Sequence, residues 1–159
     1  MFGGENLRLK KGLIAGFFAG IVRVILNLLK YKMFKDYYIL PSSSGHQLDG
    51  NPTRWLVQTG ITDLIVGILF GLLYGLLVNS LPGKGLKKGL GYGFVIWIIS
   101  EWPSLLIACM TGMIDWILIV LWGIGGLITS LVIGVGIVFI YDAVLKKENP
   151  KHEIRNTKQ

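Results

Sequence analysis

Two charged residues, Arg23 and Glu101, lie within long apolar runs of this sequence. If these runs cross a bilayer, each charge costs about 3 kcal/mol even on the mildest insertion scale, so such residues face other helices and pair. At a helical rise of about 1.5 Å per residue, Arg23 lies roughly 16 Å from the basic start of its run, and Glu101 roughly 18 Å from the start of its own. Their similar depth predicts an ion pair or a shared polar cavity. Because arginine does not readily lose its proton, Arg23 requires an anion close to it within the span.

Other polar residues near this depth, or just beyond it, complete a candidate intramembrane cluster with the arginine and the glutamate: Asp63, Asn27, Ser100 and Asp115. The two aspartates have an alternative role as helix N-caps, in which a carboxylate accepts from the free N–H groups at a helix start. The Arg23–Glu101 pair also has an alternative role, because a buried ion pair can serve only to fix the register of two helices. The sequence leaves these alternatives open.

The composition indicates that the apolar runs cross a membrane. Of the 159 residues, 52% are hydrophobic and 16% are charged, and the mean hydropathy is +0.60. A soluble domain carries about 25% charged residues, and a run of about twenty apolar residues is long enough to span a bilayer. We therefore predict an all-α polytopic membrane protein whose lipid-embedded domain, residues 1–145, precedes a basic tail, 146–159. The predicted bundle has four spans, at 12–29, 59–80, 89–109 and 116–141, with an outer loop over 30–58.

The distribution of Lys and Arg predicts the orientation of the bundle. The N-terminal tail, the loop between the second and third spans and the C-terminal tail together hold eleven of these residues, whereas the opposite side holds four. The positive-inside rule then places both termini in the cytoplasm and Trp55, Trp102 and Trp116 near the outer boundary. The net charge of +7 follows from this retention of basic residues. We therefore expect the lipid bilayer as partner and no nucleic acid.

Small residues recur every four positions in each predicted span, which places them on one helix face and permits close contact between helix backbones. These candidate packing residues are Gly12, Gly16 and Gly20, then Gly67, Gly71 and Gly75, then Gly89 and Gly93, and finally Gly126, Ser130 and Gly134. Packing within the bundle is the simpler interpretation. A ladder not used inside the bundle would form the seam of a homo-oligomer or of a larger membrane complex.

A weak internal repeat accompanies these ladders. Lys, Gly, Leu, Gly and Phe of segment 11–17 recur in the same places in segment 88–94, 77 positions later. The helices that follow each begin at an apolar-x-Asp step, ending in Asp63 and Asp115. Two hairpins with the same orientation would be related by an axis along the membrane normal.

Other chemistry finds little support in the sequence. His46 and His152 lie in the outer loop and the tail and have no second ligand at metal-binding spacing, so we expect no metal and no cofactor. Gly83-Lys84-Gly85 lacks the rest of a phosphate-binding motif and the strand that would precede it. We predict that the protein is not an enzyme.

Residues 70–100, FGLLYGLLVNSLPGKGLKKGLGYGFVIWIIS, resemble the YagU-like family of small bacterial inner-membrane proteins. The glycine-rich span with its Leu-Tyr-Gly-Leu step, the short basic loop and the Gly-x-Gly-Phe span rich in Trp carry the resemblance. The family's opening helix is similar to residues 12–21. Its Pro-Pro-Arg type segment is missing here, where Lys30–Lys35 and Pro41 stand instead. The resemblance covers about half the chain and implies the bacterial cytoplasmic membrane, but no settled activity.

Three functions remain open from the sequence. The first is a polar path for ions, protons or a small solute, lined by Arg23 and Glu101 inside the bundle. The alternative is a non-catalytic accessory or assembly subunit of a larger membrane complex. The third, a membrane enzyme that uses Glu101 and Asp63, is the least favoured.

Overall fold

The computed structural model describes residues 3–38, 52–111 and 116–148, which form four α-helices and, within these ranges, no strand. The helices are α1 (Gly3–Tyr38), α2 (Pro52–Leu77), α3 (Gly85–Thr111) and α4 (Trp116–Glu148). Each contains a segment long and apolar enough to cross a membrane: Asn6–Met33, Leu56–Leu77, Gly85–Thr111 and Ile119–Val144. The prediction of an all-α protein with four such helices is confirmed for the described residues.

The helices are longer than the predicted spans. Much of the loop expected over 30–58 is helical, since α1 continues to Tyr38 and α2 begins at Pro52. No Gly or Pro interrupts 30–38, and proline fits a first helical position because the N–H that it lacks would have no partner there. At the other end α2 stops at Leu77, where the N–H groups of Ser80 and Leu81 bond back to its carbonyl. The expected tail begins as helix, because α4 continues to Glu148.

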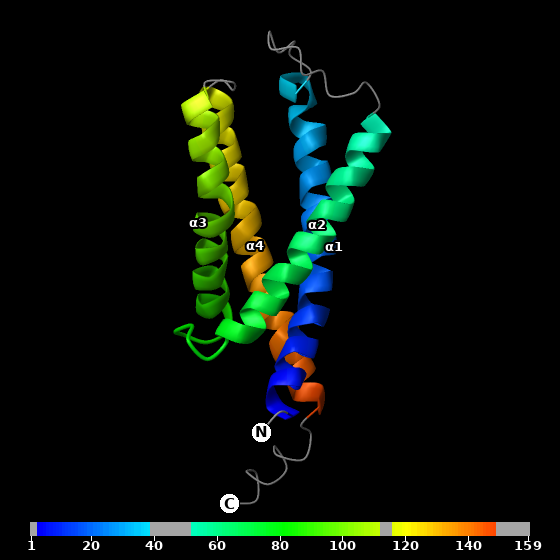
Figure 1. Cartoon of the computed structure of the whole chain (residues 1–159), viewed down its shortest axis with the longest axis vertical. Coiled ribbons are helices and arrows are strands. Elements are labelled where there is room, and N and C mark those ends of the chain that lie inside the picture. The colour runs from blue at the N-terminus through cyan, green and yellow to red at the C-terminus, as the bar shows by residue number, and fades with distance from the viewer. Residues whose placement is uncertain (1–2, 39–51, 112–115, 149–159) are drawn as a thin grey trace, which may run out of the picture.

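The four helices run antiparallel in succession, and two pairs dominate their packing (Figure 1). α1 packs along α2, α3 packs along α4, and α1 also contacts α4. The start of α1 and the end of α4 lie at the same end of the bundle, called here the terminal end, together with the α2–α3 connection (Figure 1). From that connection α2 leans away from α3 toward the far end, so these consecutive helices share little contact.

The α1–α2 pair is held through direct contact of the two backbones. A Cβ atom placed on Gly12 would lie 2.5 Å from the Gly71 oxygen, and one on Gly16 would lie 2.6 Å from the Gly67 oxygen. On Gly20 it would approach the Leu64 Cα to 2.9 Å. Any side chain at these positions would force the helices apart, so the hairpin requires small residues where the two backbones touch. Gly75 continues the face, opposite the Arg8 carbonyl.

The α3–α4 pair repeats this arrangement. A Cβ on Gly89 would lie 2.7 Å from the Val135 Cα, one on Gly93 would lie 2.5 Å from the Ser130 oxygen, and Gly134 faces both glycines. Gly67 and Gly71 therefore correspond to Ser130 and Gly134, 63 positions later. In this register the counterpart of Asp63 is Gly126, whereas the sequence pattern pairs Asp63 with Asp115. Asp115 itself lies outside the described residues.

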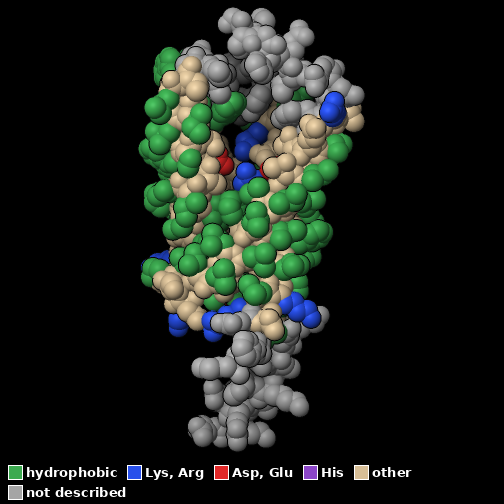
Figure 2. Space-filling model, viewed as in Figure 1, with side chains coloured by type: hydrophobic (Ala, Val, Ile, Leu, Met, Phe, Trp, Pro, Cys, Tyr) green, Lys and Arg blue, Asp and Glu red, His purple; other side chains and the backbone are tan. Residues whose placement is uncertain are grey.

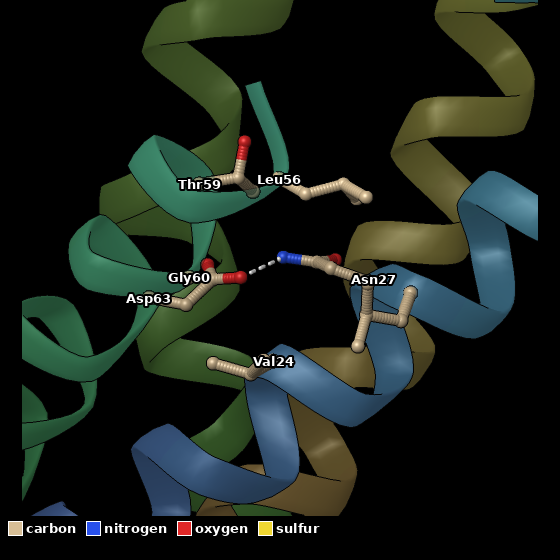
Figure 3. Close-up of a pocket in the computed structure, with 7 residues that line it drawn as sticks. Val24, Asn27, Leu56, Thr59, Gly60 and Asp63 are labelled. Atoms are coloured by element: carbon tan, nitrogen blue, oxygen red, sulfur yellow. Dashed lines mark hydrogen bonds between the residues drawn. The ribbon is translucent and has the colours of Figure 1, made fainter. Parts of the chain in front are cut away.

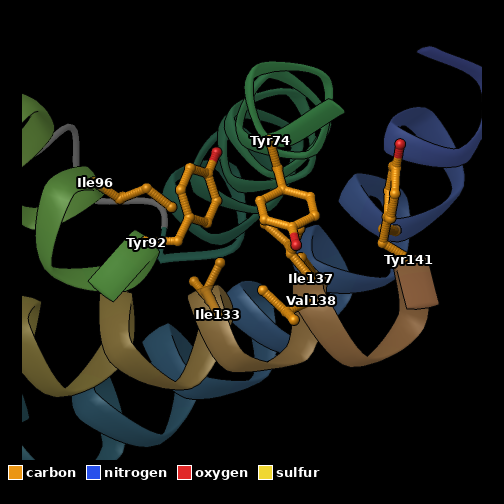
Figure 4. Packing of buried hydrophobic residues seen from close by; sticks show 9 residues of the cluster. Tyr74, Tyr92, Ile96, Ile133, Ile137, Val138 and Tyr141 are labelled. Carbon is orange, nitrogen blue, oxygen red and sulfur yellow. The ribbon is translucent and has the colours of Figure 1, made fainter. Parts of the chain in front are cut away.

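Three buried tyrosines close the terminal half of the bundle (Figure 4). The ring of Tyr74 from α2 lies 5.0 Å from that of Tyr92 on α3 and 5.1 Å from that of Tyr141 on α4. The Tyr92 hydroxyl donates to the Phe70 carbonyl, and the Lys88 ammonium donates to the Val78 carbonyl. These contacts connect α3 with α2 near their connection, which leaves the far ends of the two helices apart.

Gly93→Ala tests the backbone contact, with Gly91→Ala as its matched control. The new methyl group at Gly93 must displace the α4 backbone, whereas a Cβ at Gly91 meets no atom within 4 Å in the described structure. Overpacking of this kind costs about 1–3 kcal/mol. We expect Gly93→Ala to lower the thermal unfolding midpoint of the purified protein, followed by circular dichroism, and Gly91→Ala to leave it unchanged. Equal midpoints for the two variants would contradict the assigned interface.

Candidate functional site

The best-formed polar contact in the described structure joins α1 and α2. The Arg23 Nε donates to the Asp63 Oδ1 at 2.7 Å. The Asn27 Nδ2 donates to the Asp63 Oδ2 at 2.6 Å, a bond that Figure 3 shows. The aspartate side chain is 6% exposed and that of the arginine 16%. Both carboxylate oxygens of Asp63 are thus occupied by donors one helical turn apart on α1. This aspartate is the principal counter-ion of Arg23.

Asp63 lies in the interior of its helix, eleven residues after Pro52, so it does not cap α2. Arg23, Asp63 and Glu101 each lie about 5 Å from the centre of their span, toward the far end of the bundle. The side chains of α1, α2 and α3 therefore meet at one depth. The common depth expected for the arginine and the glutamate extends to the aspartate, which the sequence prediction placed at the rim.

Glu101 approaches the same guanidinium group less closely. Its Oε1 lies 3.9 Å from the Arg23 Nη2, which is an ion-pair distance but longer than a hydrogen bond. The glutamate side chain is 26% exposed and packs over Gly126, where a Cβ would lie 3.1 Å from its Cδ. Gly126 thus makes room for a carboxylate instead of a helix backbone. Glu101 is the loosely held anion of the cluster, and Asp63 is the firmly held one.

Lys30 is a member of the cluster that the sequence prediction missed, because it was assigned to the outer loop. α1 continues through it, and a Cβ on Gly125 would lie 3.6 Å from its Cδ, so the side chain extends along α4. It is close enough to interact electrostatically with Glu101, Arg23 and Asp63. Arg23, Asn27 and Lys30 follow one another at spacings of four and three, which places them on one helix face. This spacing was visible in the sequence.

Other predicted members lie apart from these contacts. The Ser100 hydroxyl donates to the Ile96 carbonyl of its own helix at 2.8 Å. Asp115 and the two histidines lie outside the described residues. Trp102 and Trp116 are exposed on the helices that carry them, at 45% and 70%, whereas the side chain of Trp55 is not among those described.

The charged side chains lie around a hollow in the far half of the bundle. Figure 2 shows acidic and basic side chains within this hollow, between the α3–α4 pair and α2, in a view from the side of the bundle. A second small pocket lies between α1 and α2 beside Asn27 and Asp63 (Figure 3). Two cations, Arg23 and Lys30, balance two anions, Asp63 and Glu101. The cluster is therefore neutral overall and polar throughout.

This arrangement is suited to binding and releasing a small polar group. Among the described residues, no group of three His, Cys, Asp or Glu side chains is placed to hold a metal ion. The Arg23 Nη1 is buried and has no hydrogen-bond partner in the described part of the chain, and the Glu101 carboxylate makes no short hydrogen bond there. The partly exposed Glu101 carboxylate thus retains the capacity to accept a further hydrogen bond.

Comparisons of this chain with protein-family models, with characterised proteins and with solved structures give no match. The sequence and the site geometry are therefore the basis for the functional proposal.

The hierarchy of the two anions can be tested by neutralising each one. Asp63→Asn leaves the buried Arg23 without its hydrogen-bonded counter-ion, which costs about 3 kcal/mol. Glu101→Gln removes a longer and partly exposed contact, worth less than about 1 kcal/mol. We expect Asp63→Asn to lower the unfolding free energy more than Glu101→Gln in detergent.

A double variant provides the control for this comparison. Arg23→Gln combined with Asp63→Asn removes both charges, so it should be more stable than Asp63→Asn alone. If Glu101→Gln proved as destabilising as Asp63→Asn, the assignment of Asp63 as the principal counter-ion would be wrong.

Proposed function

We propose that this protein is a multi-pass membrane protein that provides a polar path for protons, ions or a small solute between its two helical hairpins. The observation that carries the proposal is the unequal binding of the two anions. Asp63 is saturated by Arg23 and Asn27, whereas Glu101 stands 3.9 Å from the same guanidinium group and remains partly exposed. Glu101 can therefore release Arg23 and bind another group without the loss of a buried hydrogen bond.

Two further features support a path rather than a purely structural ion pair. A structural pair is favoured when it is enclosed and fully bonded, yet the hollow in Figure 2 leaves the charged side chains open to one side. An intramembrane charge is costly, so its retention at an open position favours a function. In this proposal Glu101 and Lys30 bind and release the transported species. The Arg23–Asp63 pair stays in place and lines the path.

The orientation and location belong to the same proposal. The excess of basic residues on the side that carries the termini supports cytoplasmic termini. The bacterial inner membrane rests on the resemblance to the YagU-like family, which stays a prediction. In this orientation the hollow faces the outer leaflet.

The accessory-subunit alternative has one observation in its favour, namely that the far halves of α2 and α3 diverge and share little contact (Figure 1). The glycine faces themselves do not favour it, because the glycines of the four-residue ladders already contact helix backbone or Glu101 within the chain. A partner would therefore have to use the opening between α2 and α3.

Flux measurements in proteoliposomes test the proposal. We expect wild-type protein to dissipate an imposed proton or potassium gradient, followed with entrapped fluorescent indicators. We expect Glu101→Gln to slow this flux about ten-fold, which corresponds to the loss of one charge-assisted contact. Asp142→Asn, which removes a carboxylate near the terminal end of α4, should leave flux unchanged.

The opposite pattern favours the accessory role. If neither gradient is dissipated and Glu101→Gln instead abolishes co-purification of another membrane protein, the proposed path is wrong.

A further inference from the structure

The opening between α2 and α3 is lateral. Both helices contact their own partners, α1 and α4, but above the tyrosine cluster they separate toward the far end of the bundle (Figure 1). The hollow is visible from the side of the bundle in Figure 2, along a direction perpendicular to the helix axes. In a membrane this direction leads into lipid, so the charged cluster has access to the bilayer.

Lipid tails cannot stabilise the charges of that cluster. A charge exposed to hydrocarbon about 5 Å from the centre of a span is strongly unfavourable unless a polar group or water reaches it. An occupant that reaches the hollow from the bilayer combines a polar portion for the hollow with an apolar portion for the bilayer. A phospholipid has this combination, and it surrounds the opening at high local concentration.

The charges indicate the type of headgroup. Lys30 lies about 16 Å from the centre of its span, close to the depth at which a hydrocarbon core of about 30 Å gives way to phosphate groups. Its ammonium suits a phosphate. Glu101 lies deeper, at the depth of Arg23, and suits an ammonium group.

From these observations we infer that the cluster binds the headgroup of a zwitterionic phospholipid, which enters laterally between α2 and α3. The inference deepens the proposed function, since it names the amphiphile class that the same site accepts. Lys30 contacts the phosphate and Glu101 contacts the amine, while Asp63 with Asn27 holds the Arg23 guanidinium group in place beside Glu101. The acyl chains remain in the bilayer beside the opening.

Native mass spectrometry of the purified full chain tests this inference. The protein is titrated with phosphatidylethanolamine, phosphatidylglycerol and diacylglycerol of identical acyl chains. We expect the affinity to be highest for phosphatidylethanolamine and lowest for diacylglycerol, which lacks both phosphate and amine. Glu101→Gln should weaken phosphatidylethanolamine binding about ten-fold, as the loss of one charge-assisted contact predicts, with little effect on phosphatidylglycerol.

Two matched pairs of variants separate binding from folding. Asp142→Asn controls for loss of a carboxylate elsewhere. Gly126→Ala keeps every charge but places a methyl group 3.1–3.2 Å from the Glu101 carboxylate and Cγ, so it should also weaken phosphatidylethanolamine binding. Gly136→Ala on the same helix meets no atom within 4 Å and should not.

Three results would overturn the inference: equal binding of the three lipids, an unaltered preference in Glu101→Gln, and displacement of the lipid by equimolar glycerophosphoethanolamine. The last would identify a soluble solute as the ligand. Because binding is measured without a gradient, it can fail while proteoliposome flux persists, and it can persist where flux fails.

Discussion

The arrangement of this bundle depends on the guanidinium group of Arg23, which requires a polar partner inside the span. A guanidinium group does not readily lose its proton, so a carboxylate is required beside Arg23 within the span. Asp63 supplies that carboxylate from α2, and Asn27 holds its second oxygen. This bond sets the register of α1 against α2 at one depth. It also leaves Glu101 as a second anion with a looser role.

Close backbone packing makes that register possible. In lipid there is no hydrophobic effect to drive helices together, so van der Waals contact and polar bonds carry the association. Glycine at every fourth position brings α1 onto α2, and α3 onto α4, without intervening side chains. Each hairpin is therefore a compact unit. The contacts between hairpins are fewer, being concentrated in α1–α4 packing and in the tyrosine cluster at the terminal end.

The sequence predicted those features that depend on a single span, such as its length and the depth of a charge within it. Apolar length predicted four helices, and the depth of Arg23 and Glu101 predicted that they would lie close together. The choice between Asp63 and Glu101 as the principal counter-ion depends on which helix packs closest to α1, and no pattern within one span encodes this. Lys30 was missed for a different reason. The polar composition after Leu29 suggested a loop, but nothing in 30–38 breaks a helix, so α1 continues beyond the apolar run.

The separation of Arg23 from its counter-ion along the chain has a consequence for biogenesis. Asp63 follows forty residues later, on the next helix. During synthesis the first span therefore leaves the ribosome with an uncompensated cation, whose transfer into lipid is costly by itself. Insertion of α1 together with α2 pairs that cation with Asp63 within the bilayer. The hairpin of α1 and α2 is therefore a less costly unit to insert than α1 alone.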